Sequence, residues 1–541
     1  MKRSSFFFCN FFLAVLGAIF FAGSHSNYLF VKGLPFLAYI SLVPFFILIK
    51  RVSLKYVSLW GAFCGILSYF LFNFWIIFFH PLAVYIIIIQ YAIVYACLFP
   101  VLKIADLSFP KYGFLAQSIL WVGYEYIKTL GFTGYPYGIM GYTQWQIPFL
   151  VRTSSVFGVF GLSFLIVLFS AILSLSVYKA FFAGKLKKNG FRSFKISFFA
   201  CKNFFIIWIC LFLGFCFYGF FSYRSYENFP KKKIVLVQPN RDPWIGNIEV
   251  YKQNFEDLKN LSERAMQQNE KPDLIVWPET AFVPRIKWHY KYSENRGSSL
   301  LVRDLLKFIN DSDIPFLIGN DDAVLKNETE PPSDDNRLDY NAALFFIPKK
   351  NVLPPEPDTY RKIHLVPFTE HFPYKNMFPL IYDFLEKNDT HFWEKGNDVV
   401  IFKLKDLRIG TPICFEDIFG YISATFVKNN ANLIINITND AWASSLTAQY
   451  QHLGMAVFRA AENRVPLLRA AISGQTAYIT PNGEIESMLE PFSSGFLQTE
   501  VPVLTKHFKT VYTVAGDFFG SGAALSSFFI LFFAFFKRLK K

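Results

Sequence analysis

Three polar residues, each placed beside an apolar run, have the types that acyl-transfer chemistry needs. Glu279 follows Leu274–Trp277 and a proline, Lys362 precedes the apolar run that starts at residue 365, and Cys414 follows Arg408–Ile413. A thiolate is a strong nucleophile, and an ammonium group stabilises a thiolate or an oxyanion. A carboxylate at a strand end is dehydrated, which favours its protonation and suits a general base. Together they are suited to covalent catalysis at the cysteine.

Taken singly, the same residues have simpler explanations. Cys414 could be a packed thiol, Glu279 a cap at the end of a strand, and Lys362 a solvated surface charge. Cys414 is the one cysteine of seven in the polar part of the chain, so an internal disulfide there is excluded. No CxxC or Cys/His spacing of a zinc site occurs. The sequence therefore predicts neither a metal nor a cofactor.

The elements that position these residues lie in residues 230–515, where short apolar runs alternate with helical stretches. Such alternation predicts an α/β layer architecture. In this arrangement Cys414 lies at a strand-to-helix turn, where helix N-terminal amides favour a thiolate. The predicted strands are Ile234–Gln238, Leu274–Trp277, Pro315–Ile318, Ala342–Phe346, Arg408–Ile413, Leu433–Ile437 and Thr476–Thr480, and the predicted helices are Tyr251–Gln268, Gly297–Asn310 and Gln449–Asn463.

The rest of the chain is strongly apolar. Hydrophobic residues make up 53% of the sequence, and there are 67 phenylalanines, which is typical of a membrane protein. Runs of about 20 apolar residues predict transmembrane helices. We expect a transmembrane domain of seven spans over 1–225, the polar domain over 230–515, and an eighth span with a basic tail over 516–541. The expected spans are 5–23, 29–49, 57–79, 82–102, 113–131, 156–178, 203–222 and 519–536.

Basic residues gather in alternate connecting segments, notably 2–3, 50–55, 179–202 and 537–541. Because cytoplasmic loops carry the excess of Lys and Arg, both ends of the chain are expected inside the cell. The polar domain then lies outside, in the periplasm of a Gram-negative bacterium. The same distribution accounts for the net charge of +14 without a nucleic-acid partner.

Short motifs carry a resemblance to a known family. WPE at 277–279, Lys362 before HLVPF, and Cys-Phe-Glu at 414–416 are similar to the Glu-Lys-Cys triad of the nitrilase superfamily. Within it, eight spans with the polar domain between the last two resemble the apolipoprotein N-acyltransferases. The resemblance implies a nitrilase-like α-β-β-α sandwich joined to a polytopic eight-helix transmembrane domain. The segments that carry this closer resemblance are 134–137, 141–144, 365–370, 439–442, 451–456, 466–469 and 481–485.

The resemblance also implies roles for single residues. Cys414 is the expected nucleophile and Glu279 the general base, while Lys362 and the backbone N–H of Phe415 hold the oxyanion. The expected supporting residues are Glu370 and Glu416, which would orient Lys362, and Trp244, which would lie at the lipid entrance.

The implied reaction takes an acyl group from a phospholipid, with phosphatidylethanolamine as the expected donor. The implied acceptor is the N-terminal S-diacylglyceryl cysteine of a lipoprotein, in the last step of lipoprotein maturation at the bacterial inner membrane. The chain departs from the family at Thr369 (usually Gly), at Phe415 (usually Tyr) and at Ala443-Ser444 (usually Phe-Gly). These changes bear on substrate fit more than on the chemistry.

Four alternatives remain open. A membrane-anchored amidase needs the same triad, but one span would anchor it. A related membrane acyltransferase would differ only in its acceptor. A transporter or receptor is disfavoured because charge is sparse within the spans. A Cys/His protease would use His364, His371 or His452 with Cys414, and would leave the WPE segment without a role.

Overall fold

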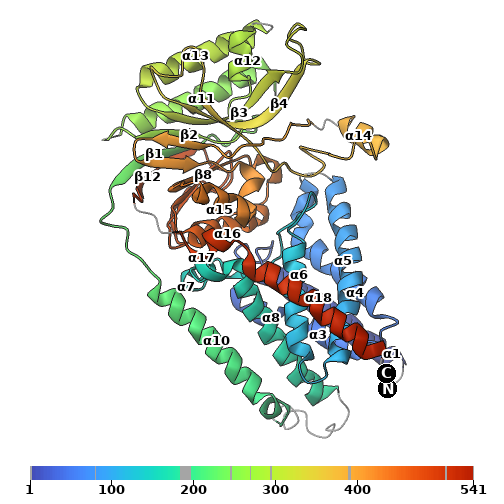
Figure 1. The fold of residues 1–541 in the computed structure, drawn as a ribbon. Helices are drawn as coiled ribbons and strands as arrows, with labels where there is room; N and C mark the ends of the chain where they lie inside the picture. The colour runs from blue at the N-terminus through green and yellow to red at the C-terminus, as the bar shows by residue number, and fades with distance from the viewer. Residues whose placement is uncertain are drawn as a thin grey trace. The chain divides into compact units, whose positions relative to one another are not determined.

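The computed structural model describes residues 3–78, 81–182, 196–243, 246–268, 270–292, 295–387, 391–505 and 509–539. The chain divides into two compact units (Figure 1). The first comprises Met1–Tyr223, Ser445–Phe458 and Ala515–Lys541, and the second comprises Arg224–Ser444 and Arg459–Val514.

The first unit is helical. Within the described residues, six of its helices are long and apolar enough to cross a membrane. They cover Ser5–Ser24, Val57–Phe78, Ala83–Ser108, Ser154–Phe181, Lys202–Phe221 and Phe518–Leu539. The helices of the unit are α1 (Arg3–Ser24), α2 (Ala38–Ser41), α3 (Val43–Arg51), α4 (Val57–Asn73), α5 (Pro81–Ser108), α6 (Gly113–Ile127), α7 (Pro148–Val151), α8 (Ser154–Phe181), α10 (Lys202–Phe221) and α18 (Phe518–Leu539), with 3-10 turns η1 (Pro35–Leu37), η2 (Phe74–Phe78) and η3 (Met140–Gln144).

Two expected spans take a different form. The run 29–49 is divided among η1, α2 and α3, and both η1 and α3 begin at or next to a proline. Proline is favoured in the first helical turn and disfavoured further along, so Pro35 and Pro44 each restart the helix. The run 113–131 forms α6, which has 15 residues. Several apolar helices are thus present, and the count of eight spans stays a prediction.

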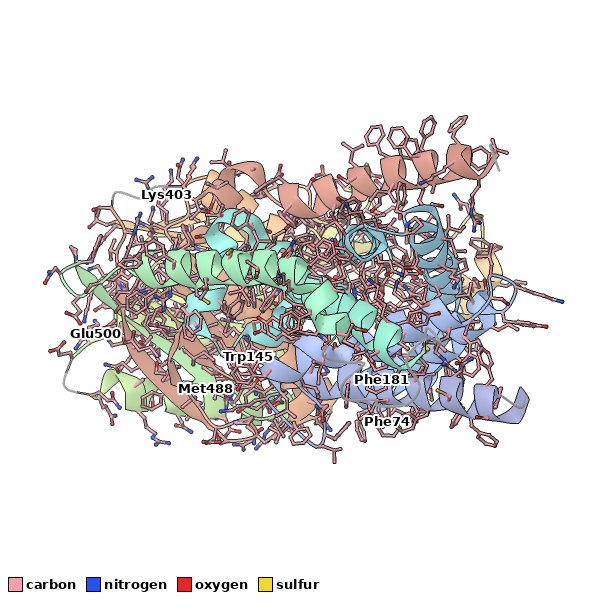
Figure 2. The ribbon with its side chains drawn as sticks, turned by 90° about the horizontal axis from the view of Figure 1, so that it is seen from below. Phe74, Trp145, Phe181, Lys403, Met488 and Glu500 are labelled. Atoms are coloured by element: carbon pink, nitrogen blue, oxygen red, sulfur yellow. The ribbon has the colours of Figure 1, made fainter. Side chains whose placement is uncertain are left out.

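Large apolar side chains cover the outer surfaces of these helices. Phe528, Phe533 and Phe535 of α18 are each at least 60% exposed, and only 17% of α10 is buried. Figure 2 shows aromatic rings projecting along the helix at the C-terminal end of the chain. In water such a surface would be strongly unfavourable, so these faces contact lipid and the chain is a multi-pass membrane protein.

Two polar side chains, buried Glu125 and half-buried Lys128, hold the loop that follows α6. Glu125 Oε1 accepts a hydrogen bond from the backbone N–H of Met140 at 3.0 Å. Lys128 Nζ donates to the carbonyl of Tyr137 at 2.8 Å and to the hydroxyl of Tyr69 at 3.1 Å. Both side chains therefore hold the loop that contains residues 134–144.

The second unit contains two six-stranded sheets, ordered β12-β1-β2-β3-β4-β5 and β11-β10-β9-β8-β7-β6. Strands β1, β2 and β3 are parallel in the first sheet, as are β7, β8 and β9 in the second. The strands are β1 (Lys231–Gln238), β2 (Leu274–Trp277), β3 (Phe316–Leu325), β4 (Arg337–Phe346), β5 (Asp358–Arg361), β6 (Ile401–Leu404), β7 (Leu407–Gly410), β8 (Leu433–Thr438), β9 (Leu467–Ala471), β10 (Ala477–Ile479), β11 (Ile485–Met488) and β12 (Gly495–Pro502).

Helices and sheets form the expected α-β-β-α sandwich. Figure 1 shows α11 (Ile248–Met266) and α13 (Arg296–Ser312) covering one face of the first sheet. Phe255, Leu258 and Leu261 lie on one face of α11 and pack into the same buried core as Trp277 of β2. The inner faces meet where Phe345 of β4 stacks on a phenylalanine of β6, with ring centroids 5.4 Å apart. The remaining helical elements of this unit are α12 (Ile286–Lys291), α14 (Pro379–Glu386), η4 (Cys414–Ile418), α15 (Gly420–Lys428), η5 (Ala441–Ala443) and α17 (Val511–Ala515).

Helix α16 (Leu446–Asn463) is divided between the units, and its residues up to Phe458 belong to the first. Hydrogen bonds explain this assignment. Gln451 Nε2 donates to the carbonyls of Ser26 and Phe72, and its Oε1 accepts from Trp75 Nε1. The predicted domain of residues 230–515 therefore contains a stretch that packs with the apolar helices.

Candidate active site

Glu279 is fixed at the end of β2, where the strand gives way to Pro278. Its side chain is buried, and Oε1 accepts from Asn341 Nδ2 at 2.7 Å while Oε2 accepts from the Asn439 N–H at 2.7 Å. Gly319 of β3 lies directly beneath it, because a Cβ there would be 2.5 Å from the Glu279 Cα. The carboxylate is therefore held by donors from two separate segments, and the backbone that carries it lies against a third.

Lys362 follows β5 and is completely buried. Its Nζ lies 2.8 Å from Glu370 Oε1 and 3.4 Å from Glu279 Oε1. Burial alone would lower the pKa of Lys362, but the two carboxylates raise it above its ordinary value. The ammonium group therefore stays charged between the two acids.

Cys414 opens η4 with a backbone φ of +50°. A residue other than glycine rarely adopts this left-handed conformation, and such strain is common at functional sites. Asn436 of β8 holds the turn by donating to the carbonyl of Cys414 at 3.2 Å. The predicted strand extends to Ile413, whereas β7 ends at Gly410. The helix after it is a 3-10 helix of five residues, so the stabilisation expected from helix amides is smaller.

The thiol of Cys414 is neutral in the folded protein. Burial raises its pKa well above the ordinary value, and the negative charge of Glu279 raises it further, whereas Lys362 lowers it. A neutral thiol must lose its proton as it attacks, so it needs a base. Glu279 and Lys362, whose charges act on Cys414, are therefore suited to proton transfer and charge stabilisation respectively.

Two further carboxylates support these residues in different ways. Glu370 contacts Lys362 directly and accepts the Val366 N–H at 2.8 Å. Glu416 is fully buried and accepts the Ile363 N–H at 2.7 Å and the Ile413 N–H at 2.8 Å. Ile363 follows Lys362 and Ile413 precedes Cys414. Glu416 therefore ties the backbone at Lys362 to the backbone at Cys414.

The environment of Glu416 is closed by Tyr360 of β5, whose hydroxyl donates to both carboxylate oxygens at 2.9 Å. Burial raises the pKa of Glu416 to about 7, although the backbone donors and Lys362 lower it. Phe415 lies in η4 beside this carboxylate, and its ring is 5.2 Å from that of Phe419. Trp244, the expected residue at the lipid entrance, lies outside the described residues.

Several residues at the site were not singled out from the sequence. Asn341 is far from Glu279 along the chain, and nothing in the local pattern marks it, whereas Tyr360 lies two residues before Lys362 and had no assigned role. Arg469 and Asp440 stood inside recognised segments without an assigned role. The arrangement as a whole places a thiol, a carboxylate and an ammonium group in one buried site, which suits covalent acyl transfer.

Comparison with known proteins agrees with the fold of the second unit. Residues 235–507 match the family model described as carbon-nitrogen hydrolase. The yeast protein Nit3 of the nitrilase superfamily (Saccharomyces cerevisiae) is similar in structure, with 19% identity, a TM-score of 0.37, and coverage of 52% of this chain and 93% of Nit3. The second unit is thus a nitrilase-type α/β domain, on the strength of the family match.

The whole chain has closer relatives. Residues 8–172 match the model described as the N-terminal domain of apolipoprotein N-acyltransferase. Apolipoprotein N-acyltransferase 1 of Treponema denticola is 58% identical over 526 residues, covering 96% of this chain and 95% of the relative. The protein of the same name from Treponema pallidum is 44% identical over 523 residues, covering 96% and 94%. The chain belongs to the apolipoprotein N-acyltransferase family and is an acyltransferase.

Proposed function

We propose that this protein transfers a fatty acyl group from a phospholipid to the N-terminal amine of a diacylglyceryl-modified lipoprotein, through a thioester on Cys414. Membership of the family supports N-acylation of lipoproteins. The observation that carries the chemistry is the buried arrangement of Cys414, Glu279 and Lys362, with Lys362 Nζ 3.4 Å from Glu279 Oε1.

In the first half-reaction Glu279 removes the proton of the Cys414 thiol as the sulfur attacks an ester carbonyl of the phospholipid. Lys362 and the backbone N–H of Phe415 stabilise the oxyanion of the tetrahedral intermediate. When the carbon–oxygen bond breaks, Glu279 returns the proton to the departing alkoxide of the lysophospholipid. The acyl group then remains on the sulfur as a thioester.

In the second half-reaction the α-amine of the acceptor cysteine attacks the thioester carbonyl. Glu279 takes a proton from the attacking amine, and the same oxyanion site stabilises the intermediate. The carbon–sulfur bond then breaks, and Glu279 gives the proton to the departing sulfur of Cys414. An amide is more stable than a thioester, so the transfer runs downhill without an added energy source. Glu370 keeps Lys362 in place during both steps, since its Oε1 lies 2.8 Å from Nζ.

An exposed apolar segment supports a lipid donor. In and before α14, the side chains of Met377, Leu380 and Phe384 are 68%, 83% and 52% exposed. The segment follows directly on the loop that carries Glu370. An amidase for small soluble amides has no need of such a surface, whereas an enzyme that draws its substrate from a bilayer does. We further propose phosphatidylethanolamine as the donor and the periplasmic side of the bacterial inner membrane as the place of reaction.

The test is a two-substrate assay on the purified full-length protein in detergent. We expect radiolabelled phosphatidylethanolamine alone to give a hydroxylamine-sensitive acyl-enzyme and free lysophospholipid. Adding a diacylglyceryl-modified peptide should discharge the label into a triacylated peptide. Cys414→Ala and Cys414→Ser should form neither product. A hydroxylamine-sensitive adduct that persists in Cys414→Ala would refute the nucleophile, and release of ammonia from small amides instead of lysophospholipid would favour an amidase.

A further inference from the structure

Two buried carboxylates lie directly beside the proposed catalytic groups without a role in the chemistry described so far. Asp417 belongs to η4 and comes three residues after Cys414. Asp440 follows Asn439, whose backbone N–H binds Glu279. Both side chains are almost completely shielded from solvent. Each therefore belongs to a turn that positions one member of the catalytic set.

One arginine joins these two turns. Arg469 of β9 is fully buried, with one guanidinium nitrogen 2.8 Å from Asp417 Oδ2 and another 2.7 Å from Asp440 Oδ2. Because guanidinium is planar and carries several donors in a fixed geometry, one side chain can bind two separate carboxylates at once. The ammonium group of a lysine is a compact point charge on a flexible stem, so it is poorly suited to this bridge.

The position of Arg469 is set by the register of the second sheet. Arg469 pairs with Asn436 across the parallel strands β8 and β9, so the two side chains lie next to each other on one face. Asn436 Nδ2 donates to the carbonyls of Pro412 and Cys414 at 3.1 and 3.2 Å. Two neighbouring residues of the sheet therefore hold the Cys414 turn. Asn436 binds the backbone carbonyls of the turn, and Arg469 binds the side chain of Asp417.

The other end of the bridge is equally confined. Thr438 Oγ1 lies 3.1 Å from Asp440 Oδ1. Gly474 passes so close that a Cβ there would lie 2.5 Å from Asp440 Oδ2. Asp440 therefore has little freedom to follow a displaced partner, and a loosened bridge would move the turns rather than the aspartate alone.

We propose that Arg469 is a positioning residue for acyl transfer, because its guanidinium group binds both Asp417 and Asp440. This bridge fixes the position of the Cys414 turn relative to the loop that binds Glu279. This inference rests on the proposed function, since it assumes that Cys414 and Glu279 act together. Arg469 does not touch the substrate in this role. It keeps the nucleophile and its base at a fixed separation while the thiol gives up its proton.

Arg469→Lys is the direct test, because it keeps the positive charge and removes the planar guanidinium group that binds both aspartates. Two rates are measured on the full-length protein in detergent: acyl-enzyme formation from labelled phosphatidylethanolamine, and alkylation of Cys414 by iodoacetamide, followed by mass spectrometry of its peptide. We expect acyl-enzyme formation to fall roughly tenfold to a hundredfold, since small misplacements of reacting groups have effects of this size. Alkylation does not depend on the position of Glu279 relative to Cys414, so its rate should stay near that of the wild type. The matched control is Arg464→Lys. Arg464 is also buried, and its Nη1 donates to Asn482 Oδ1, so this change should leave both rates unchanged.

Asp440→Asn provides a second test if Arg469→Lys does not fold. The charge of Asp440 raises the pKa of Cys414, so its removal should speed alkylation near neutral pH. Loss of one arm of the bridge should nevertheless slow acyl-enzyme formation. A folded Arg469→Lys protein with wild-type acylation, or an Asp440→Asn protein in which both rates rise together, would overturn the inference. Failure of the proposed function itself would appear separately, as a wild-type protein that forms no acyl-enzyme.

Discussion

At the scale of single residues, the site combines a thiol whose pKa is raised by burial with an ammonium group whose pKa is raised by two carboxylates. Glu279 has two effects on Cys414 that act in opposite directions. Its negative charge raises the pKa of the thiol, and its carboxylate is the proposed acceptor of the thiol proton. Glu279→Gln removes both effects, so the two can be separated by measuring two different reactions.

We expect Glu279→Gln to lower the pKa of Cys414, because a nearby negative charge disfavours the thiolate. The thiolate fraction near neutral pH then rises, and alkylation of Cys414 by iodoacetamide should be several-fold faster, up to about tenfold for each pKa unit. Acyl-enzyme formation should fall by roughly a hundredfold or more, as expected for loss of a general base. Glu256→Gln, the same change at an exposed position of α11, is the control. Slower alkylation in Glu279→Gln would contradict this view of the site.

At the scale of elements, the site depends on how closely β3 approaches the end of β2. Gly319 permits this approach, since a Cβ there would lie 2.5 Å from both the Cα of Glu279 and the carbonyl oxygen of Pro278. Both atoms belong to the backbone, so neither can move aside without shifting the strand end. A side chain at residue 319 would therefore displace the carboxylate from Asn341 and Lys362.

Gly319→Ala should destabilise the protein by roughly 1–3 kcal/mol, the usual effect of overpacking a buried site. It should also slow acyl-enzyme formation, because Glu279 is displaced. Thermal unfolding and the labelled-phospholipid assay measure the two effects. Gly495→Ala in β12 of the same sheet is the control, because a Cβ there has no neighbour within 4 Å. Equal behaviour of the two variants would show that the close approach has no consequence.

At the scale of the whole molecule, the prediction concerns the side of the membrane on which the second unit lies. The distribution of basic residues predicts the outside, with both chain ends in the cytoplasm. Glu328 lies in an exposed loop of the second unit, between β3 and β4. Glu328→Cys should therefore react with a membrane-impermeant maleimide in intact cells of a Gram-negative host whose outer membrane has been permeabilised.

A cysteine added after Lys541 should react only when the inner membrane is also broken. The parent protein supplies the background, since its own Cys97 and Cys210 are exposed on the apolar helices. Labelling of the Glu328→Cys protein only after lysis would place the catalytic unit in the cytoplasm and reject the predicted orientation.

The sequence by itself determined the fold class and the family, and it predicts the chemistry. Glu279, Lys362 and Cys414 could be found because each stands beside an apolar run in a short, specific motif. The predicted strands and helices are present, some longer and two strands (β7 and β10) shorter than expected, because apolar runs of that length indicate buried elements. Strands β5, β6, β9, β11 and β12 were not predicted.

Only the tertiary structure decided how the site is held. Asn341 reaches Glu279 because β4 lies one strand beyond β3, and Arg469 reaches Asp417 and Asp440 because β9 is paired with β8. Strand order and register join residues that are far apart in the chain, and local patterns do not encode them. The same limit applies to 29–49, where average hydropathy predicts one span while the prolines divide the helix. Composition and local motifs thus define which reactive side chains are present, and the strand order and register of the sheets define which of them come into contact.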